Sequence, residues 1–144
     1  MDGVYVGVDD SKDAAAALAW ALRHAAANGL PLTVVTVVDQ ANLNALWTDR
    51  SLDNARDAHI EAARRGVEDL LADVGRDAGL GTGVDVQVKV LCGHPVKELV
   101  EAATNADLLV VGSRGAGGFS RALLGSVSSG VAHHAHCPVT VVKP

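Results

Sequence analysis

Glycine and hydroxyl residues between positions 112 and 128 follow a spacing that suits the binding of phosphate groups. Gly112, Gly115, Gly125 and Ser126 form a G-x2-G-x9-G-S pattern that begins at the end of a β-branched run. A strand that leads through a glycine-rich loop into a helix presents main-chain N–H groups and a partial positive charge to an anion. The pattern therefore predicts a nucleotide phosphate site. A flexible connecting loop is the alternative, because glycine is common in this chain.

Two further strand ends carry groups that a nucleotide needs. The first Val-rich run ends at Asp9, and the second ends with Val37, Val38 and Asp39. In open α/β sheets, ligands bind at the carboxyl ends of the strands, where the strand order reverses. With the glycine loop, these ends predict an apolar slot for a base, a carboxylate for ribose hydroxyls or a metal ion, and a cradle for phosphates. For Asp9, capping of the following helix is the alternative.

Short Val-rich runs alternate with helical patterns along the whole chain. Strands are expected at 4–8, 32–38, 84–91, 108–111 and 139–142, and helices at 11–28, 51–78, 95–104 and 125–136. Ser11 is a suitable N-cap for the first helix, and Gly29 followed by Pro31 is a suitable stop. The alternation predicts an α/β fold in one domain, residues 1–144, with a doubly wound parallel sheet. Alternating polarity places 84–91 at a sheet edge, and the apolar run 108–111 indicates an interior strand.

Composition excludes several classes of function. The 144 residues carry a formal net charge of −5, and no basic cluster suggests a nucleic-acid partner. No apolar run reaches the length of a membrane span and no leader sequence opens the chain, so we expect a cytoplasmic protein without a membrane partner. Cys92 and Cys137 are expected to be free thiols. A zinc site around His133, His134 and His136 is disfavoured, because their spacing matches no zinc signature.

The chain resembles the universal stress protein family over essentially its whole length. The resemblance rests on the glycine spacing, the opening V-G-V-D-D-S, the second strand V-V-T-V-V-D and the ending H-C-P-V-T-V-V. It implies a Rossmann-like, five-stranded parallel sheet in the order 3-2-1-4-5. Members that keep the glycine motif generally bind ATP, so the resemblance also implies ATP, with Mg²⁺, as the ligand.

The resemblance assigns roles to individual residues of the expected ATP site. These are Gly7, Val8 and Asp9 at adenine and ribose, Val37 in the adenine slot, Val111, Gly112 and Gly115 along the ribose and phosphate path, and Gly125, Ser126, Val127 and Ser128 at the phosphates. The sequence departs from the family at Asp10, where a glycine is usual. A carboxylate there repels phosphates if it faces them and Mg²⁺ does not intervene, and Arg114 or Arg121 could compensate.

These features favour an ATP-binding regulatory stress-response protein with little or slow hydrolysis. No base is placed to activate water, and no Walker-type lysine is present. An ATP-cleaving or adenylating enzyme of related fold and a nucleotide-free dimeric interaction module are the alternatives. The apolar last strand, 139–142, indicates an edge open to pairing, and the resemblance implies a homodimer through it. A regulatory protein partner is expected but not identified.

Overall fold

The computed structural model describes residues 2–9, 11, 13–39, 49–77, 83–113 and 124–144, with the main chain alone for 49–55 and 77. In these residues, parallel strands form one sheet in the order β3-β2-β1-β4-β5. The strands are β1 (Val4–Gly7), β2 (Leu32–Asp39), β3 (Val86–Gly93), β4 (Leu108–Gly112) and β5 (Val139–Val142). The helices are α1 (Ala14–Asn28), α3 (Asp49–Asp77), α4 (Pro95–Ala102) and α5 (Ser126–His134). The predicted fold class and strand order are confirmed.

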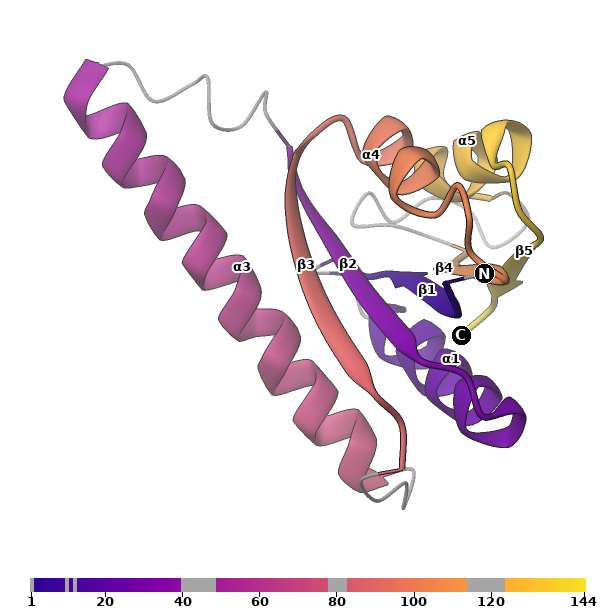
Figure 1. The fold of residues 1–144 in the computed structure, drawn as a ribbon. Helices are drawn as coiled ribbons and strands as arrows, with labels where there is room; N and C mark the ends of the chain where they lie inside the picture. The colour runs from indigo at the N-terminus through magenta and orange to yellow at the C-terminus, as the bar shows by residue number, and fades with distance from the viewer. Residues whose placement is uncertain (1, 10, 12, 40–48, 78–82, 114–123) are drawn as a thin grey trace.

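Helices cover both faces of the sheet. Helices α1 and α3 lie on one face and α4 and α5 on the other (Figure 1). Alternate strand residues therefore enter two separate cores: Val6 packs toward α1 and α3, and Tyr5 packs toward α4 and α5. Val6 lies beside Val34 of β2 and Val110 of β4, and all three side chains are fully buried.

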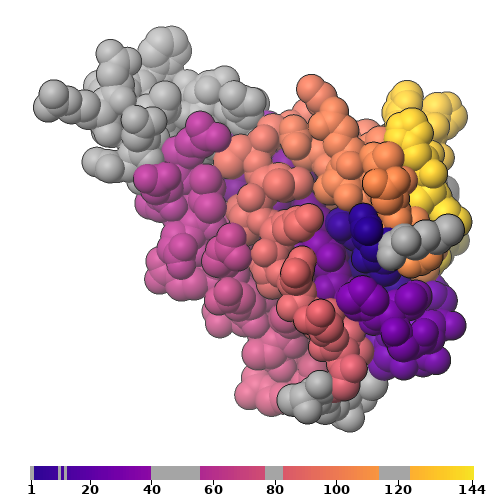
Figure 2. Space-filling model, viewed as in Figure 1, coloured from indigo at the N-terminus to yellow at the C-terminus, as the bar shows by residue number. Residues whose placement is uncertain are grey.

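The predicted edge strand and interior strand are both found. Strand β3 alternates half-buried and exposed residues over its first half, as an edge strand with one polar face should. Strand β4 lies between β1 and β5 and buries Leu109, Val110 and Val111. The space-filling view shows α3 lying along β3 on this side of the molecule (Figure 2).

The end of α1 was predicted correctly and its start was not. Gly29 adopts a left-handed conformation with φ of 63°, and the Leu30 N–H donates to the Ala25 carbonyl, which closes the helix. Ser11 is not the N-cap, because the helix begins at Ala14. The Ser11 N–H instead donates to Asp9 Oδ1 at 2.8 Å, which forms a turn ahead of the helix.

Within the described ranges, no helix has both the length and the apolar character that crossing a bilayer would demand. Cys92 and Cys137 are free, as predicted.

Candidate functional site

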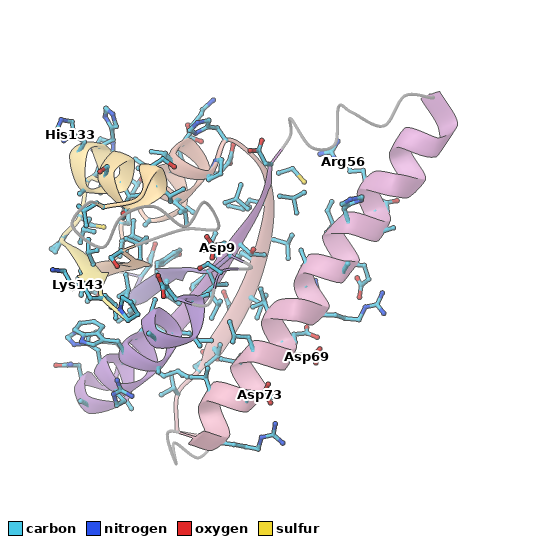
Figure 3. All side chains as sticks on the ribbon, turned by 180° about the vertical axis from the view of Figure 1, so that it is seen from behind. Asp9, Arg56, Asp69, Asp73, His133 and Lys143 are labelled. Atoms are coloured by element: carbon cyan, nitrogen blue, oxygen red, sulfur yellow. The ribbon has the colours of Figure 1, made fainter. Side chains whose placement is uncertain are left out.

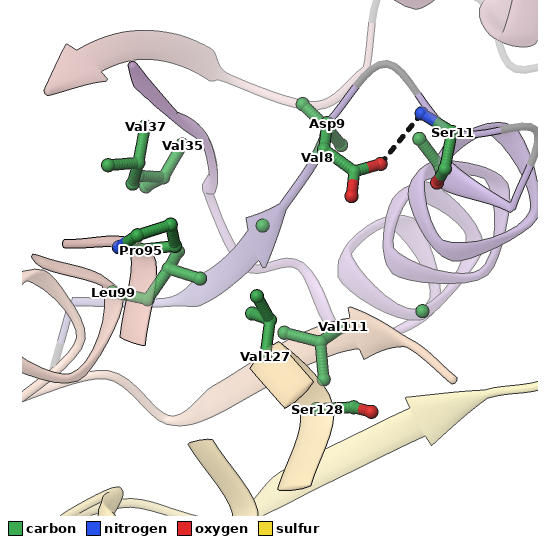
Figure 4. A pocket seen from close by; sticks show the side chains of 13 residues that line it. Val8, Asp9, Ser11, Val35, Val37, Pro95, Leu99, Val111, Val127 and Ser128 are labelled. Atoms are coloured by element: carbon green, nitrogen blue, oxygen red, sulfur yellow. Dashed lines mark hydrogen bonds between the residues drawn. The ribbon is translucent and has the colours of Figure 1, made fainter. Parts of the chain in front are cut away.

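A pocket of about 100 Å³ opens at the carboxyl ends of β1, β2 and β4. Its walls come from the strand ends, from the start of α1, from the first two turns of α4 and from the first turn of α5 (Figure 4). The described lining residues are Gly7, Val8, Asp9, Ser11, Ala14, Val35, Val37, Pro95, Leu99, Val111, Gly112, Val127 and Ser128.

The topology explains why the pocket forms at this edge. The chain leaves β1 through α1 toward β2 on one side, and it returns through α4 to β4 on the other side of β1. Strands β1 and β4 are neighbours, but β1 leads into α1 on one face of the sheet and β4 leads toward α5 on the other face, so a crevice forms between their carboxyl ends. Asp9 lies two residues beyond the end of β1, at this end of the sheet (Figure 3).

Most of the residues proposed from the sequence come together here. Those that line the pocket are Gly7, Val8, Asp9, Val37, Val111, Gly112, Val127 and Ser128. Gly125 and Ser126 are not among the lining residues and lie at the start of α5. Gly115, like Asp10, Arg114 and Arg121, lies outside the described residues.

Apolar side chains form most of the pocket wall. Val37 and Val35 stand on the same face of β2, and Leu99 faces them from α4. A Cβ added to Gly7 would lie 3.0 and 3.1 Å from the two terminal carbons of Leu99. Glycine at this position therefore lets Leu99 of α4 pack closely over the end of β1, where it forms part of the apolar wall.

Asp9 supplies a carboxylate at the mouth of the pocket. The residue is exposed, and its Oδ1 accepts the Ser11 N–H (Figure 4). This contact is a local turn and not a side-chain cap of α1, whose N-cap residue is Asp13. The carboxylate is therefore fixed by the turn while it remains open to solvent, where it can accept hydroxyl donors or bind a cation.

The start of α5 is joined to the end of β4 by a small hydrogen-bond network. The Gly125 N–H donates to the Ser113 carbonyl at 2.7 Å. The buried Ser128 hydroxyl lies 3.0 Å from that same carbonyl and 3.1 Å from the Gly125 carbonyl. These contacts occupy the Gly125 N–H and the Ser128 hydroxyl proton, so both residues hold the two ends of the glycine loop together.

Main-chain N–H groups of α5 nevertheless point out of its first turn. The first bond within the helix is from the Ser129 N–H to the Gly125 carbonyl, at 2.9 Å. The N–H groups of Ser126, Val127 and Ser128 precede it and have no partner inside the helix. An anion placed beside this turn would meet these donors and the positive end of the helix dipole.

Sequence reasoning missed the lining residues that α4 and the inner part of β2 contribute. Pro95 and Leu99 are four positions apart and therefore share one face of α4. Val35 precedes Val37 by two positions and therefore shares its face of β2. The spacing of four on α4 and the spacing of two on β2 are both visible in the sequence. Only the packing of α4 over β2 shows that these two faces meet.

The histidines near the C-terminus lie close together in sequence, and two of them are in contact. His133, labelled in Figure 3, is exposed on α5. His134 is exposed beside it, and the two rings meet edge to face. Across the part of the chain that the structure describes, no three His, Cys, Asp or Glu side chains are grouped to hold a metal ion.

Burial raises the pKa of the Cys137 thiol, and a main-chain hydrogen bond with Leu109 partly opposes the effect. Because the thiolate is the reactive form, we expect iodoacetamide to modify Cys137 at pH 8 at least about threefold more slowly in the folded chain than in urea. The rate of Cys137 modification in the folded chain should keep rising with pH at values where the rate in the unfolded chain has levelled off. The unfolded thiol ionises first, so this group also lowers stability as pH rises above its unfolded pKa. Peptide mapping by mass spectrometry measures both rates, and equal rates would contradict the prediction.

Comparisons with known proteins agree with the fold. The sequence model of the universal stress protein family matches residues 1–143. A universal stress protein of Mycolicibacterium smegmatis is 34% identical over 147 residues, and one of Mycobacterium tuberculosis is 37% identical over 142 residues. Each match covers 97% of this chain and 47% of the relative. The chain thus spans about half the length of these curated relatives.

Solved structures share the fold over nearly the whole chain. UspA from Lactobacillus plantarum superposes with a TM-score of 0.76 and 25% identity, covering 97% of this chain and 96% of that one. A universal stress protein in complex with cAMP gives a TM-score of 0.66 and 28% identity, covering 99% and 96%. The hypothetical protein MJ0577 gives a TM-score of 0.78 at 23% identity, with 99% and 96% covered, which supports the fold. With the family pattern matched from residue 1 to 143 and the fold shared, this chain belongs to the universal stress protein family.

Proposed function

We propose that this protein is a regulatory stress-response protein that binds ATP with Mg²⁺ in the pocket beside Asp9 and hydrolyses it slowly or not at all. One observation carries the proposal: an apolar slot, an open carboxylate and the first turn of α5 meet at the point where strand order reverses. A relative of the same fold was solved with a nucleotide, cAMP, which supports this ligand class.

Each part of the pocket suits one part of the nucleotide. Val37 and Leu99 offer apolar surface to the base, and Asp9 can accept hydrogen bonds from ribose hydroxyls. The N–H groups at the start of α5 suit the phosphates. Mg²⁺ supplies positive charge that bridges phosphate oxygens, and the Asp9 carboxylate is a hard oxygen donor of the kind it prefers.

The same lining supports binding over turnover. Apart from Asp9, the described lining residues include no side chain that could act as a general base toward water. We therefore expect a regulatory partner to respond to whether ATP occupies the site, and not to a reaction product.

Isothermal titration with ATP and Mg²⁺ tests the proposal, and no binding up to millimolar nucleotide would end it. Mass spectrometry of small molecules released from the purified protein shows whether the pocket is filled when the protein is isolated. Steady release of phosphate or pyrophosphate with an acceptor would favour an ATP-cleaving or adenylating enzyme instead. An empty pocket with no thermal shift on adding ATP would favour an interaction module.

Two substitutions at Asp9 separate ligand binding from the local turn. Asp9→Asn keeps an oxygen for the Ser11 N–H but removes the charge, whereas Asp9→Ala removes both. We expect both to weaken ATP·Mg²⁺ binding about tenfold, or about 1.4 kcal/mol. Only Asp9→Ala should also lower the free energy of unfolding, by about 1 kcal/mol, because it loses the hydrogen bond of the turn. Titration and chemical denaturation measure the two effects. Parent-like ATP affinity in Asp9→Asn would limit this residue to a role in the turn.

We also propose that the protein is a cytoplasmic homodimer formed through β5. This strand lies at the edge of the sheet, is half-buried and has the apolar sequence VTVV. Its outer edge has no neighbouring strand in the described ranges and can pair with a second copy. Free thiols at Cys92 and Cys137 are in keeping with a reducing compartment. Light scattering at micromolar concentration tests the assembly, and a monomer would refute it.

A further inference from the structure

A second cavity, of about 820 Å³, lies between α3 and the carboxyl ends of β1 and β2. One wall is a strip of small and apolar residues on α3: Ala62, Ala63, Gly66 and Val67. The opposite wall includes Thr36 and Val38 of β2. We refer to it below as the α3 cavity.

The α3 cavity exists because α3 diverges from the sheet toward its N-terminus. Val67 and Val74 are buried against the core, which fixes the C-terminal half of the helix. Further toward the N-terminus the facing residues are small, and a Cβ added to Gly66 would meet no atom within 4 Å. Figure 1 shows the helix axis leaving the sheet in this direction. The α3 cavity therefore has room for a chemical group that the described residues of this chain do not supply.

The α3 cavity adjoins the proposed nucleotide pocket. Val8, Asp9, Ser11 and Val37 line both spaces, so the two share a rim at the ends of β1 and β2. The nucleotide pocket extends from this rim toward α4 and α5, and the α3 cavity extends from it past α3. A single ligand can therefore occupy the pocket and reach into the cavity.

The charge of the α3 cavity restricts what can enter it. Its described lining includes the carboxylates of Asp9 and Asp39 and the imidazole of His59, with no lysine or arginine. The remaining lining is mostly apolar, from both α3 and β2. An additional phosphate would meet carboxylates there, whereas an uncharged apolar group or a cation would be accepted.

The position of the phosphates determines how the base is oriented in the pocket. If these lie at the first turn of α5, the glycosidic edge of the base faces that helix, and the amino edge of the six-membered ring points the other way. That direction leads across the shared rim toward α3. We propose, resting on the proposed function, that the site accepts adenine nucleotides with an apolar or cationic substituent on the exocyclic N6, and that the substituent occupies the α3 cavity.

Calorimetric titration with ATP, N6-benzyl-ATP and N6-(6-aminohexyl)-ATP, each with Mg²⁺, tests the inference. Both substituted nucleotides should bind at least about threefold tighter than ATP, because the benzyl ring gains buried apolar contact and the ammonium group faces carboxylates. If ATP binds but the substituted forms bind tenfold more weakly, the inference is overturned and the proposed function stands. If none of the three binds, the proposed function fails and the inference fails with it.

A matched pair of variants locates the substituent. Ala63→Phe places a ring in the α3 cavity, and Ala72→Phe places one on an exposed position of the same helix that does not line it. Ala63→Phe should abolish the advantage of N6-benzyl-ATP while ATP itself binds within twofold of the parent. Ala72→Phe should leave both affinities unchanged. An advantage that survives Ala63→Phe would place the substituent outside the cavity and overturn the proposal.

Discussion

Val37→Asp is expected to weaken ATP binding about 100-fold, or about 2.7 kcal/mol. Val37 is half-buried near the end of β2, packs with the core on the α4 side and lines the pocket. A carboxylate there would lose apolar contact with the base and would either stay charged beside an anionic ligand or be desolvated by it. Each of these effects opposes binding, and Asp9 at the same rim adds like charge.

Val86→Asp is the matched control for this variant. Val86 is also a half-buried valine on a neighbouring strand, and it packs against the other core without lining either cavity. Both variants should lose stability in chemical denaturation, but only Val37→Asp should lose affinity for ATP by titration of the folded protein. If Val86→Asp weakened ATP binding as much as Val37→Asp, the loss would be a general effect on the fold and the base slot would be misplaced.

The fold was predictable because its signals are local and repeated. Each Val-rich run and each helical pattern in the sequence became an element of the expected kind. The predicted start of α1 and the predicted end of α4 were wrong, because side chains there bond to main-chain groups near the helix ends. Asp9 takes the Ser11 N–H and delays α1 until Ala14, and the Thr104 hydroxyl bonds to the Val100 and Glu101 carbonyls just after α4 ends at Ala102.

Site residues at the ends of strands were predictable from the sequence. Site residues on a helix that crosses the sheet were less so. Asp9, Val37 and Gly112 follow from strand ends in a doubly wound sheet, since all carboxyl ends of parallel strands meet at one edge. Leu99 depends on how α4 crosses β2, which no residue spacing encodes. The α3 cavity depends on the angle at which a long helix leaves the sheet, which is set by many contacts together.

Gly130 has no side chain that could bind a ligand, but it influences the shape of the site. A Cβ added to Gly130 of α5 would lie 2.7 Å from a methyl carbon of Val96 on α4. The two helices that wall the pocket therefore approach each other more closely than an alanine would allow. The sequence shows the glycine but not the helix that lies against it.

Gly3→Ala is expected to lower the free energy of unfolding by about 2–5 kcal/mol. Gly3 has φ of 85°, which costs an L-residue about 1–2 kcal/mol, and an added Cβ would lie 2.5 Å from the Pro31 carbonyl oxygen. That oxygen cannot easily move, because it accepts the Val4 N–H at 2.9 Å. The Gly3 N–H and carbonyl are also bonded to Asp107, so the glycine cannot shift without breaking those contacts. Overpacking of this kind adds about 1–3 kcal/mol.

Gly29→Ala separates conformational strain from the steric clash. Gly29 also has positive φ, 63°, but an added Cβ meets no atom within 4 Å, so only the strain of about 1 kcal/mol remains. Chemical denaturation followed by circular dichroism compares the two variants, and a Gly3→Ala chain that is unfolded without denaturant agrees with the prediction. If Gly3→Ala cost no more than Gly29→Ala, the chain would have relaxed around Pro31. The connection between β4, β1 and β2 at the amino end of the sheet would then be looser than its hydrogen bonds indicate.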